Sequence, residues 1–351
     1  MSSPALPRRD DEDQRSSADA QRPAAGPLRV RVHGDFVEWL AATGGSLAVT
    51  TYTSGKLLLA SAPRGELTIR ETKFARPMGM AVDGAQLALA IRERLLVFRR
   101  EANHADSAPA IYALVESRAT GKLNVHDVAF GRRGIHFANT RYNCVARPSE
   151  RVSFRRVWTP PFITETVPQD RCHLNGLGMR DGEPAMITAF CATGRKGGWR
   201  EADRFTSGVM VAVPGGETVA RGLCMPHSPR RHEGAWWVCN SGEGTLCRLA
   251  EPGVCDPVAS LPGFTRGLCF AAGRAIVGLS KIRPEHILDA PPVRDRHGEL
   301  RAGVALVDLA TGRETGSLEF VRGGNEVFET AFLPGIEHAT IVAPTDPPPA
   351  E

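Results

Sequence analysis

The sequence predicts an all-β fold, a six-bladed β-propeller, and two observations lead to this prediction. The 351 residues include 36 Gly and 26 Pro, and so many turn-forming residues favour short strands over long helices. In addition, one pattern recurs along the chain at intervals of about 40 to 60 residues: an apolar run, a turn that often contains Gly, and a second apolar run. Hairpins that recur in this way are typical of propeller blades.

Six segments carry the pattern, and each is predicted to supply the innermost strand of one blade. The segments are 78–91, 126–139, 175–189, 227–240, 266–279 and 329–335. Further strand-like runs follow the hairpins, for example 94–100 and 208–215, and these are predicted to form the outer strands.

The two ends of the propeller are predicted to share one blade. Three strand-like runs near the N-terminus, 46–53, 56–61 and 66–74, have no inner partner, whereas 329–335 has no outer partners. Pairing them closes the ring and leaves no unpaired sheet edge. Seven blades are the alternative if the amphipathic stretch 35–43 is itself a strand. We expect one propeller domain over 28–340, with disordered tails at 1–27 and 341–351.

The composition excludes several classes of protein. Hydrophobic residues make up 42% and charged residues 23%, which is a globular balance, and no apolar run is long enough to span a membrane. The net charge of +4 is scattered and not interleaved with aromatic residues, so we expect no nucleic-acid partner. The first residues lack the apolar stretch of a signal peptide, which predicts a cytoplasmic protein with reduced cysteines in its core.

Aligning the six hairpins at their turns brings polar residues to one level around the axis. The aligned residues are Met78, His126, Asn175, His227, Arg266 and Glu329. His173 lies two residues before Asn175 and therefore on the same side of its strand. Asn139 and Asn240 end the second strands of their hairpins and are predicted to lie beside His126 and His227.

Three imidazoles near one mouth of the axis predict a metal centre. His126, His173 and His227 would be the ligands of a divalent transition metal, Fe or Cu in the first place and Zn or Mn otherwise. Glu329 would act as a fourth ligand or support one. The alternative is that these histidines are hydrogen-bonded pore residues or line a pocket for a small molecule.

Other polar residues are predicted to bind the substrate. Arg266 is placed to pair with a substrate carboxylate or phosphate and is predicted, with Glu329, to be catalytic; an ion pair between Arg266 and Glu329 is the alternative. Arg171 and Arg230 flank the histidine motifs and are expected to line the mouth. Substrate orientation is assigned to Asn139, Asn175 and Asn240.

Four short motifs also resemble a known family. Residues 172–177 (CHLNGL), 225–230 (MPHSPR), 240–242 (NSG) and 264–268 (FTRGL) resemble a bacterial family of conserved hypothetical proteins, and the similarity covers about residues 36–337. Members of that family are sometimes fused to, or encoded near, tetratricopeptide-repeat proteins. The resemblance therefore implies a repeat protein as a partner, but it supplies no reaction.

The leading functional hypothesis is a metal-dependent oxidoreductase or oxygenase that acts on a small molecule or peptide. A metal-dependent hydrolase or lactonase is one alternative, and a non-catalytic propeller that binds a peptide or small molecule is another. The sequence contains no HExxH, no Walker loop and no GxGxxG after a strand, which excludes the common zinc-protease and nucleotide-binding sites. The stretch 281–302 is expected to form a long loop that overhangs the mouth.

Overall fold

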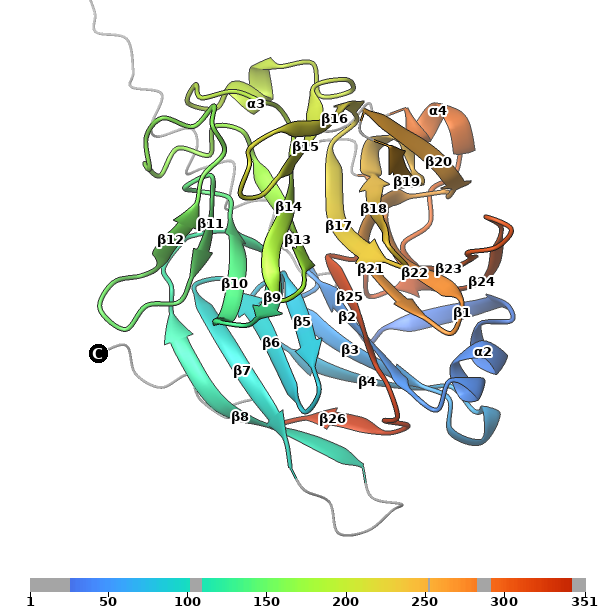
Figure 1. Ribbon diagram of the computed structural model, residues 1–351. Coiled ribbons are helices and arrows are strands. Elements are labelled where there is room, and N and C mark those ends of the chain that lie inside the picture. The colour runs from blue at the N-terminus through green and yellow to red at the C-terminus, as the bar shows by residue number, and fades with distance from the viewer. Residues whose placement is uncertain (1–25, 102–108, 252, 283–291, 343–351) are drawn as a thin grey trace, which may run out of the picture.

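The computed structural model describes residues 26–101, 109–251, 253–282 and 292–342. The expected tail at 1–27 lies almost wholly outside the described residues, as does most of that at 341–351. The described residues form six sheets around a central axis, antiparallel except for one pair of strands, which confirms the predicted six-bladed propeller (Figure 1). The stretch 35–43 contains a helix, α2 (Phe36–Ala42), and no seventh blade is formed in the described part of the chain.

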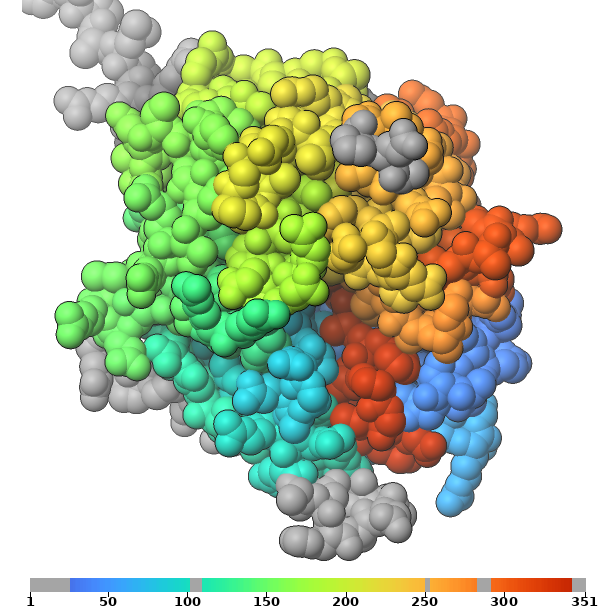
Figure 2. All heavy atoms as spheres, viewed as in Figure 1, coloured from blue at the N-terminus to red at the C-terminus, as the bar shows by residue number. Residues whose placement is uncertain are grey.

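The first blade contains both ends of the propeller, as predicted. Its innermost strand is β25 (Glu329–Leu333), which pairs with β2 (Ser46–Thr51), followed outward by β3 (Lys56–Ser61) and β4 (Thr68–Lys73). In Figure 2 the red C-terminal segment lies between the blue and cyan blades, where it completes the ring.

The next two blades follow in chain order. The second consists, from the axis outward, of β5 (Met80–Asp83), β6 (Gln86–Ile91), β7 (Arg94–Arg100) and β8 (Ala110–Ala119), and β26 (Ala339–Ile341) joins β8 in parallel. The third consists of β9 (Val125–Gly131), β10 (Gly134–Asn139), β11 (Cys144–Arg147) and β12 (Arg155–Trp158).

Three more blades complete the ring. The fourth is β13 (Leu174–Arg180), β14 (Glu183–Ala189), β15 (Gly208–Ala212) and β16 (Thr218–Leu223). The fifth is β17 (Pro226–His232), β18 (Ala235–Asn240), β19 (Thr245–Glu251) and β20 (Val254–Ser260). The sixth is β21 (Phe264–Ala271), β22 (Arg274–Ser280), β23 (Gly303–Asp308) and β24 (Glu314–Arg322), with β1 (Arg29–Gly34) added outside.

Glycine-containing turns set the register of three inner hairpins. In each turn the residue before Gly and the Gly itself both have positive φ, as the tight type I′ turn requires. These pairs are 181–182, 233–234 and 272–273. Apolar side chains on the two faces of each sheet pack between neighbouring blades, so the core is a series of layers around the axis.

In the fourth and sixth blades a long connection joins the second strand to the third, and both connections lie near the end of the axis where the inner strands begin. One runs from β14 to β15 and contains the short helix α3 (Gly198–Glu201); the other runs from β22 to β23 and contains α4 (Val293–His297). Residues 283–291 of the second connection, part of the predicted loop, lie outside the described residues. Two three-residue 3₁₀ turns complete the elements, η1 (Pro63–Gly65) and η2 (Ser241–Glu243).

All eight cysteines are free thiols and six of them are buried, in agreement with reduced core cysteines. Among the described residues no helix is both long enough and apolar enough to cross a membrane.

Candidate active site at the mouth of the inner strands

The aligned residues lie where the inner strands begin. In four consecutive blades the residue two positions before the aligned one has the left-handed backbone conformation that non-glycine residues rarely adopt. These residues are Arg76, Asn124, His173 and Met225, with φ between 50° and 53°. The same local bend therefore presents Met78, His126, Asn175 and His227, which supports the alignment derived from the sequence.

His126 and His227 are held in the same way by equivalent residues of their blades. The Nδ1 atom of His126 lies 3.0 Å from the carbonyl oxygen of Asn124 and 2.7 Å from the Thr140 hydroxyl. Likewise, Nδ1 of His227 lies 3.0 Å from the carbonyl oxygen of Met225 and 2.9 Å from the Ser241 hydroxyl.

These partners determine which ring nitrogen carries the proton. A carbonyl oxygen can only accept a hydrogen bond, and each hydroxyl donates its own proton to a carbonyl: Thr140 to Leu174 and Ser241 to Cys239. Nδ1 must therefore be the donor in both imidazoles. The Nε2 atoms of the neutral rings consequently carry lone pairs that can accept a proton or a hydrogen bond.

His173 is held by a carboxylate instead. Its Nδ1 atom lies 3.0 Å from Oδ2 of Asp170, so this ring also donates from Nδ1, and its neutral form presents an Nε2 lone pair. Its ring packs edge-on against His126, with centroids 4.9 Å apart, and lies 4.4 Å from the ring of Phe190 and 4.5 Å from that of Trp199. The left-handed backbone at His173 costs free energy, as it often does at functional sites.

The structure thus brings the three histidines together. Phe190 also contacts the His227 ring, with centroids 5.3 Å apart, and so joins it to His173. Burial lowers the pKa of His126 and His227 well below the usual value, and the neighbouring imidazoles and Arg266 lower both further. Both rings are therefore neutral at pH 7.

Arg266 completes the mouth with a positive charge. Its guanidinium carbon lies 3.3 Å from the centroid of the Phe328 ring, and the same ring lies 5.4 Å from that of His126. Nη2 is buried and has no hydrogen-bond partner among the described residues. Burial lowers the pKa of Arg266 to about 10, so the group stays charged at pH 7.

The three asparagines have different surroundings. Oδ1 of Asn175 accepts from the Thr188 hydroxyl at 2.7 Å, which leaves its buried Nδ2 without a partner. Oδ1 of Asn139 accepts from the backbone N–H of Tyr142, and its buried Nδ2 is also unpartnered. Oδ1 of Asn240 accepts from the N–H of Cys224 at 2.7 Å. Asn139 and Asn240 therefore support the backbone, Asn175 holds a neighbouring side chain, and Asn139 and Asn175 keep a free donor.

The prediction that Arg230 lines this mouth is wrong. Its guanidinium forms two hydrogen bonds with the Asp127 carboxylate, at 2.8 and 3.0 Å, and a third with Glu329 at 2.9 Å. Both acids are 2% exposed. Carboxylates can be buried to this extent because each is paired with the opposite charge of Arg230. We call Asp127, Arg230 and Glu329 the axial ion cluster.

The Glu329 carboxylate, which was predicted to bind the metal or to support a ligand, belongs to this cluster instead. Glu329 binds Arg230 rather than Arg266, and it accepts from the backbone N–H groups of Leu268 and Thr330 at 3.3 and 3.0 Å. Burial raises its pKa to about 7. Arg171 is likewise engaged, with Glu165 at 2.6 Å and Gln169 at 3.0 Å, because it belongs to the connection before β13.

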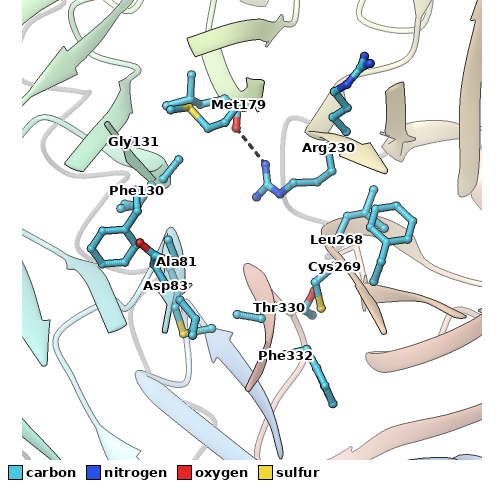
Figure 3. A pocket seen from close by; sticks show the side chains of 18 of the residues that line it. Ala81, Asp83, Phe130, Gly131, Met179, Arg230, Leu268, Cys269, Thr330 and Phe332 are labelled. Carbon is cyan, nitrogen blue, oxygen red and sulfur yellow. Dashed lines mark hydrogen bonds between the residues drawn. The ribbon is translucent and has the colours of Figure 1, made fainter. Parts of the chain in front are cut away.

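A cavity of about 1000 Å³ lies beyond the axial ion cluster, where the inner strands end (Figure 3). Its walls come from all six inner strands and the turns after them, and they include Phe130, Met179, Leu268 and Phe332. Arg230 is directed into its centre. Along each inner strand the residues that line the cavity come after the aligned residue, so the histidines and the cavity lie at opposite ends of the axis.

The predicted metal centre does not follow directly from this geometry. In the part of the chain that the structure describes, no three His, Cys, Asp or Glu side chains lie in an arrangement that could hold a metal ion. The tied Nδ1 atoms and the Nε2 lone pairs match what a metal ligand needs, but the positions do not. The metal therefore stays a prediction.

Several residues of the mouth were not predicted. Asp170 and the aromatic side chains of Phe190 and Trp199 lie outside the repeated hairpins, so the alignment could not place them. Asp127 directly follows His126 and was not considered. A charged residue inside an apolar inner strand was the available signal, because such a residue must find a partner.

Comparison with protein families gives one match, which spans residues 34–342 and is described as a domain of unknown function, DUF4915. The chain belongs to the DUF4915 family. This agrees with the expected resemblance to an uncharacterised family, while the association with tetratricopeptide-repeat proteins stays a prediction. No curated protein matches the DUF4915 chain.

Two solved structures share the fold of the DUF4915 chain at low identity. A protein of unknown function from Bacteroides caccae is 10% identical with a TM-score of 0.53, and the match covers 82% of this chain and 98% of that one. A chain of a nidogen/laminin complex is also 10% identical, with a TM-score of 0.52 and coverage of 83% and 99%. At this identity the likeness concerns the propeller fold alone.

Proposed function

We propose that the histidine mouth is a hydrolytic active site in which His173 acts as the general base. The observation that carries the proposal is the 3.0 Å hydrogen bond between the Asp170 carboxylate and Nδ1 of His173. A base oriented by a second group is the arrangement on which general-base catalysis depends.

Each neighbouring residue has a role in such a reaction. Nε2 of His173 takes a proton from water while the water oxygen attacks a carbonyl carbon, and Asp170 stabilises the imidazolium that forms. The bond from that carbon to the alcohol oxygen of the ester or lactone then breaks, and the imidazolium gives its proton to the leaving oxygen, which restores neutral His173. The Arg266 guanidinium offers a charged donor to the oxyanion. The hydroxyls of Thr140 and Ser241 donate to backbone carbonyls, so neither is prepared as a nucleophile and water is the attacking group.

The test is hydrolysis of a panel of p-nitrophenyl esters and five- and six-membered lactones by the full chain. His173→Ala should lower kcat/KM by about 10² to 10⁴, and Asp170→Asn should lower it to a smaller extent. His232→Ala is the matched control, because this imidazole, on β17 of the fifth blade, stacks on Phe270 of the sixth blade at 4.1 Å and is not at the mouth. Turnover that survives His173→Ala would contradict the proposal.

Two alternatives give different results in the same experiments. A metal-dependent oxidoreductase, which rests on the three imidazoles alone, requires a bound transition metal and gives no hydrolysis. A non-catalytic binding module gives no turnover with any substrate, yet keeps a ligand affinity that depends on the mouth residues.

A further inference from the structure

We infer that the ligand of the histidine mouth is a small hydroxylated anion, whose charged group binds Arg266 and whose hydroxyls donate to the imidazole Nε2 atoms. The inference rests on the proposed function only for the place of the site, and it names the substrate class of that site. It combines three features of the mouth: an unpaired charge, buried donors without partners, and acceptors without donors.

Among the described residues Arg266 forms no ion pair, although the more distant carboxylates of Glu326 and Glu329 stabilise its charge. Glu329, the acid at the neighbouring aligned position, is bound to Arg230 instead. Arg266 packs on the Phe328 ring, which offers a favourable contact but not a full counter-charge. A half-buried guanidinium in this situation favours an anionic ligand and repels a cationic one.

Two buried N–H groups at the mouth lack an acceptor in the described part of the chain. They are Nη2 of Arg266 and Nδ2 of Asn175, which occupy aligned positions of the sixth and fourth blades. Nε1 of Trp199, whose ring lies against His173, is a third such donor. An unpaired buried donor is unfavourable, and the oxygens of a carboxylate or phosphate would satisfy these groups.

The three Nε2 atoms supply the complementary acceptors. Their Nδ1 atoms are all committed as donors, and the Nε2 atoms make no hydrogen bond among the described residues. Ligand hydroxyls can donate to these lone pairs, whereas an alkyl chain cannot. The mouth thus presents donors for an anion and acceptors for hydroxyl groups, and the aromatic rings of Phe190, Trp199, Phe264 and Phe328 contact its histidines.

Three six-carbon probes separate these features, and isothermal titration calorimetry measures their binding to the full chain. Gluconate carries both the anion and the hydroxyls, hexanoate carries only the anion, and glucitol carries only the hydroxyls. We expect gluconate to bind at least about tenfold more tightly than either of the others, since each removes a set of hydrogen bonds. Hexanoate or glucitol binding as tightly as gluconate, or no binding of gluconate at millimolar concentration, would overturn the inference.

Variants assign the binding to named residues. Arg266→Gln should weaken gluconate about tenfold or more, and Arg266→Lys should recover part of the affinity because the charge is restored. Arg231→Gln, at an exposed position, should change nothing. If Arg266→Gln and Arg266→Lys both keep full affinity, the anion does not bind Arg266 and the inference is wrong.

None of the three probes can be hydrolysed, so this test is independent of the proposed reaction. Gluconate affinity that depends on Arg266, together with no ester or lactone hydrolysis, would support the ligand class and contradict the general-base role. Hydrolysis that depends on His173, without selective gluconate binding, would support the general-base role and contradict the ligand class.

Discussion

Removing Arg230 should strongly destabilise the propeller, because it leaves two carboxylates buried without their cation. Arg230→Met keeps most of the aliphatic volume and deletes only the guanidinium. Asp127 then loses two hydrogen bonds and Glu329 loses one, and in the intact protein both are only 2% exposed.

The magnitude follows from what each acid retains. Breaking a buried pair by removing one partner costs about 3 to 5 kcal/mol. Asp127 keeps one backbone donor, Leu177 N–H at 2.9 Å, and Glu329 keeps two. Burial raises the pKa of Glu329 to about 7 even beside Arg230, and removing Arg230 raises it further, so Glu329 takes up a proton in the variant as the pH falls and the loss becomes smaller. We therefore expect a loss of about 3 to 5 kcal/mol at pH 8 and a smaller one at pH 6.

Urea unfolding followed by circular dichroism at pH 8 and pH 6 measures this loss. Arg231→Met is the matched control, since the neighbouring arginine is exposed, and it should change the free energy of unfolding by less than about 0.5 kcal/mol. The triple variant Asp127→Asn, Arg230→Met, Glu329→Gln removes all the charges and should recover much of the stability. A loss under about 1 kcal/mol for Arg230→Met at pH 8 would refute the reasoning.

Three further predictions concern titration and metal content. Folding raises the pKa of Glu329 from 4.5 to about 7, so this group's stabilising contribution is complete below pH 4.5 and is lost as the pH rises through 7. In unfolding experiments between pH 5 and 8, Glu329→Gln should remove this pH dependence, which amounts to at most about 3 kcal/mol in the free energy of unfolding. Folding lowers the pKa of His126 and His227, so their contribution to stability is present above pH 6.5 and is lost as the pH falls. Replacing both with Gln should therefore make the thermal unfolding midpoint fall less steeply as the solution is acidified, and an unchanged fall would contradict this prediction. If the three histidines hold a transition metal, protein purified without a His tag should contain about one equivalent, which His227→Ala abolishes; metal analysis near zero after anaerobic reconstitution with Fe(II) would eliminate the metal centre.

The repeated hairpins made the fold predictable, because turn residues and strand periodicity are local properties of the sequence. They gave the six blades, the blade shared by both chain ends, and the level at which His126, Asn175 and His227 lie. The helix α2 settled the number of blades: its apolar residues Phe36 and Leu40 are four apart, as on one face of a helix, and both are fully buried.

The partners of the polar residues could not be predicted in the same way. Which acid Arg230 contacts depends on how three blades converge at the axis, since Arg230 is separated in sequence by 103 positions from Asp127 and by 99 from Glu329. The alignment assigned one residue to each blade and therefore overlooked Asp127 beside His126. Asp170 was overlooked because it lies in a connection, where no repeat gives a register.

The shared first blade also affects how the protein is made. Strand β2 emerges from the ribosome early, and its partner β25 is 279 residues later at the pair formed by Thr50 and Glu329. At about 5 to 20 residues per second, translation needs roughly 15 to 60 s to supply that partner. During this interval β2, whose six residues are all buried in the finished ring, is an unpaired sheet edge on a nascent chain. The edge of β2 must therefore be protected from pairing with other nascent chains until β25 has been translated.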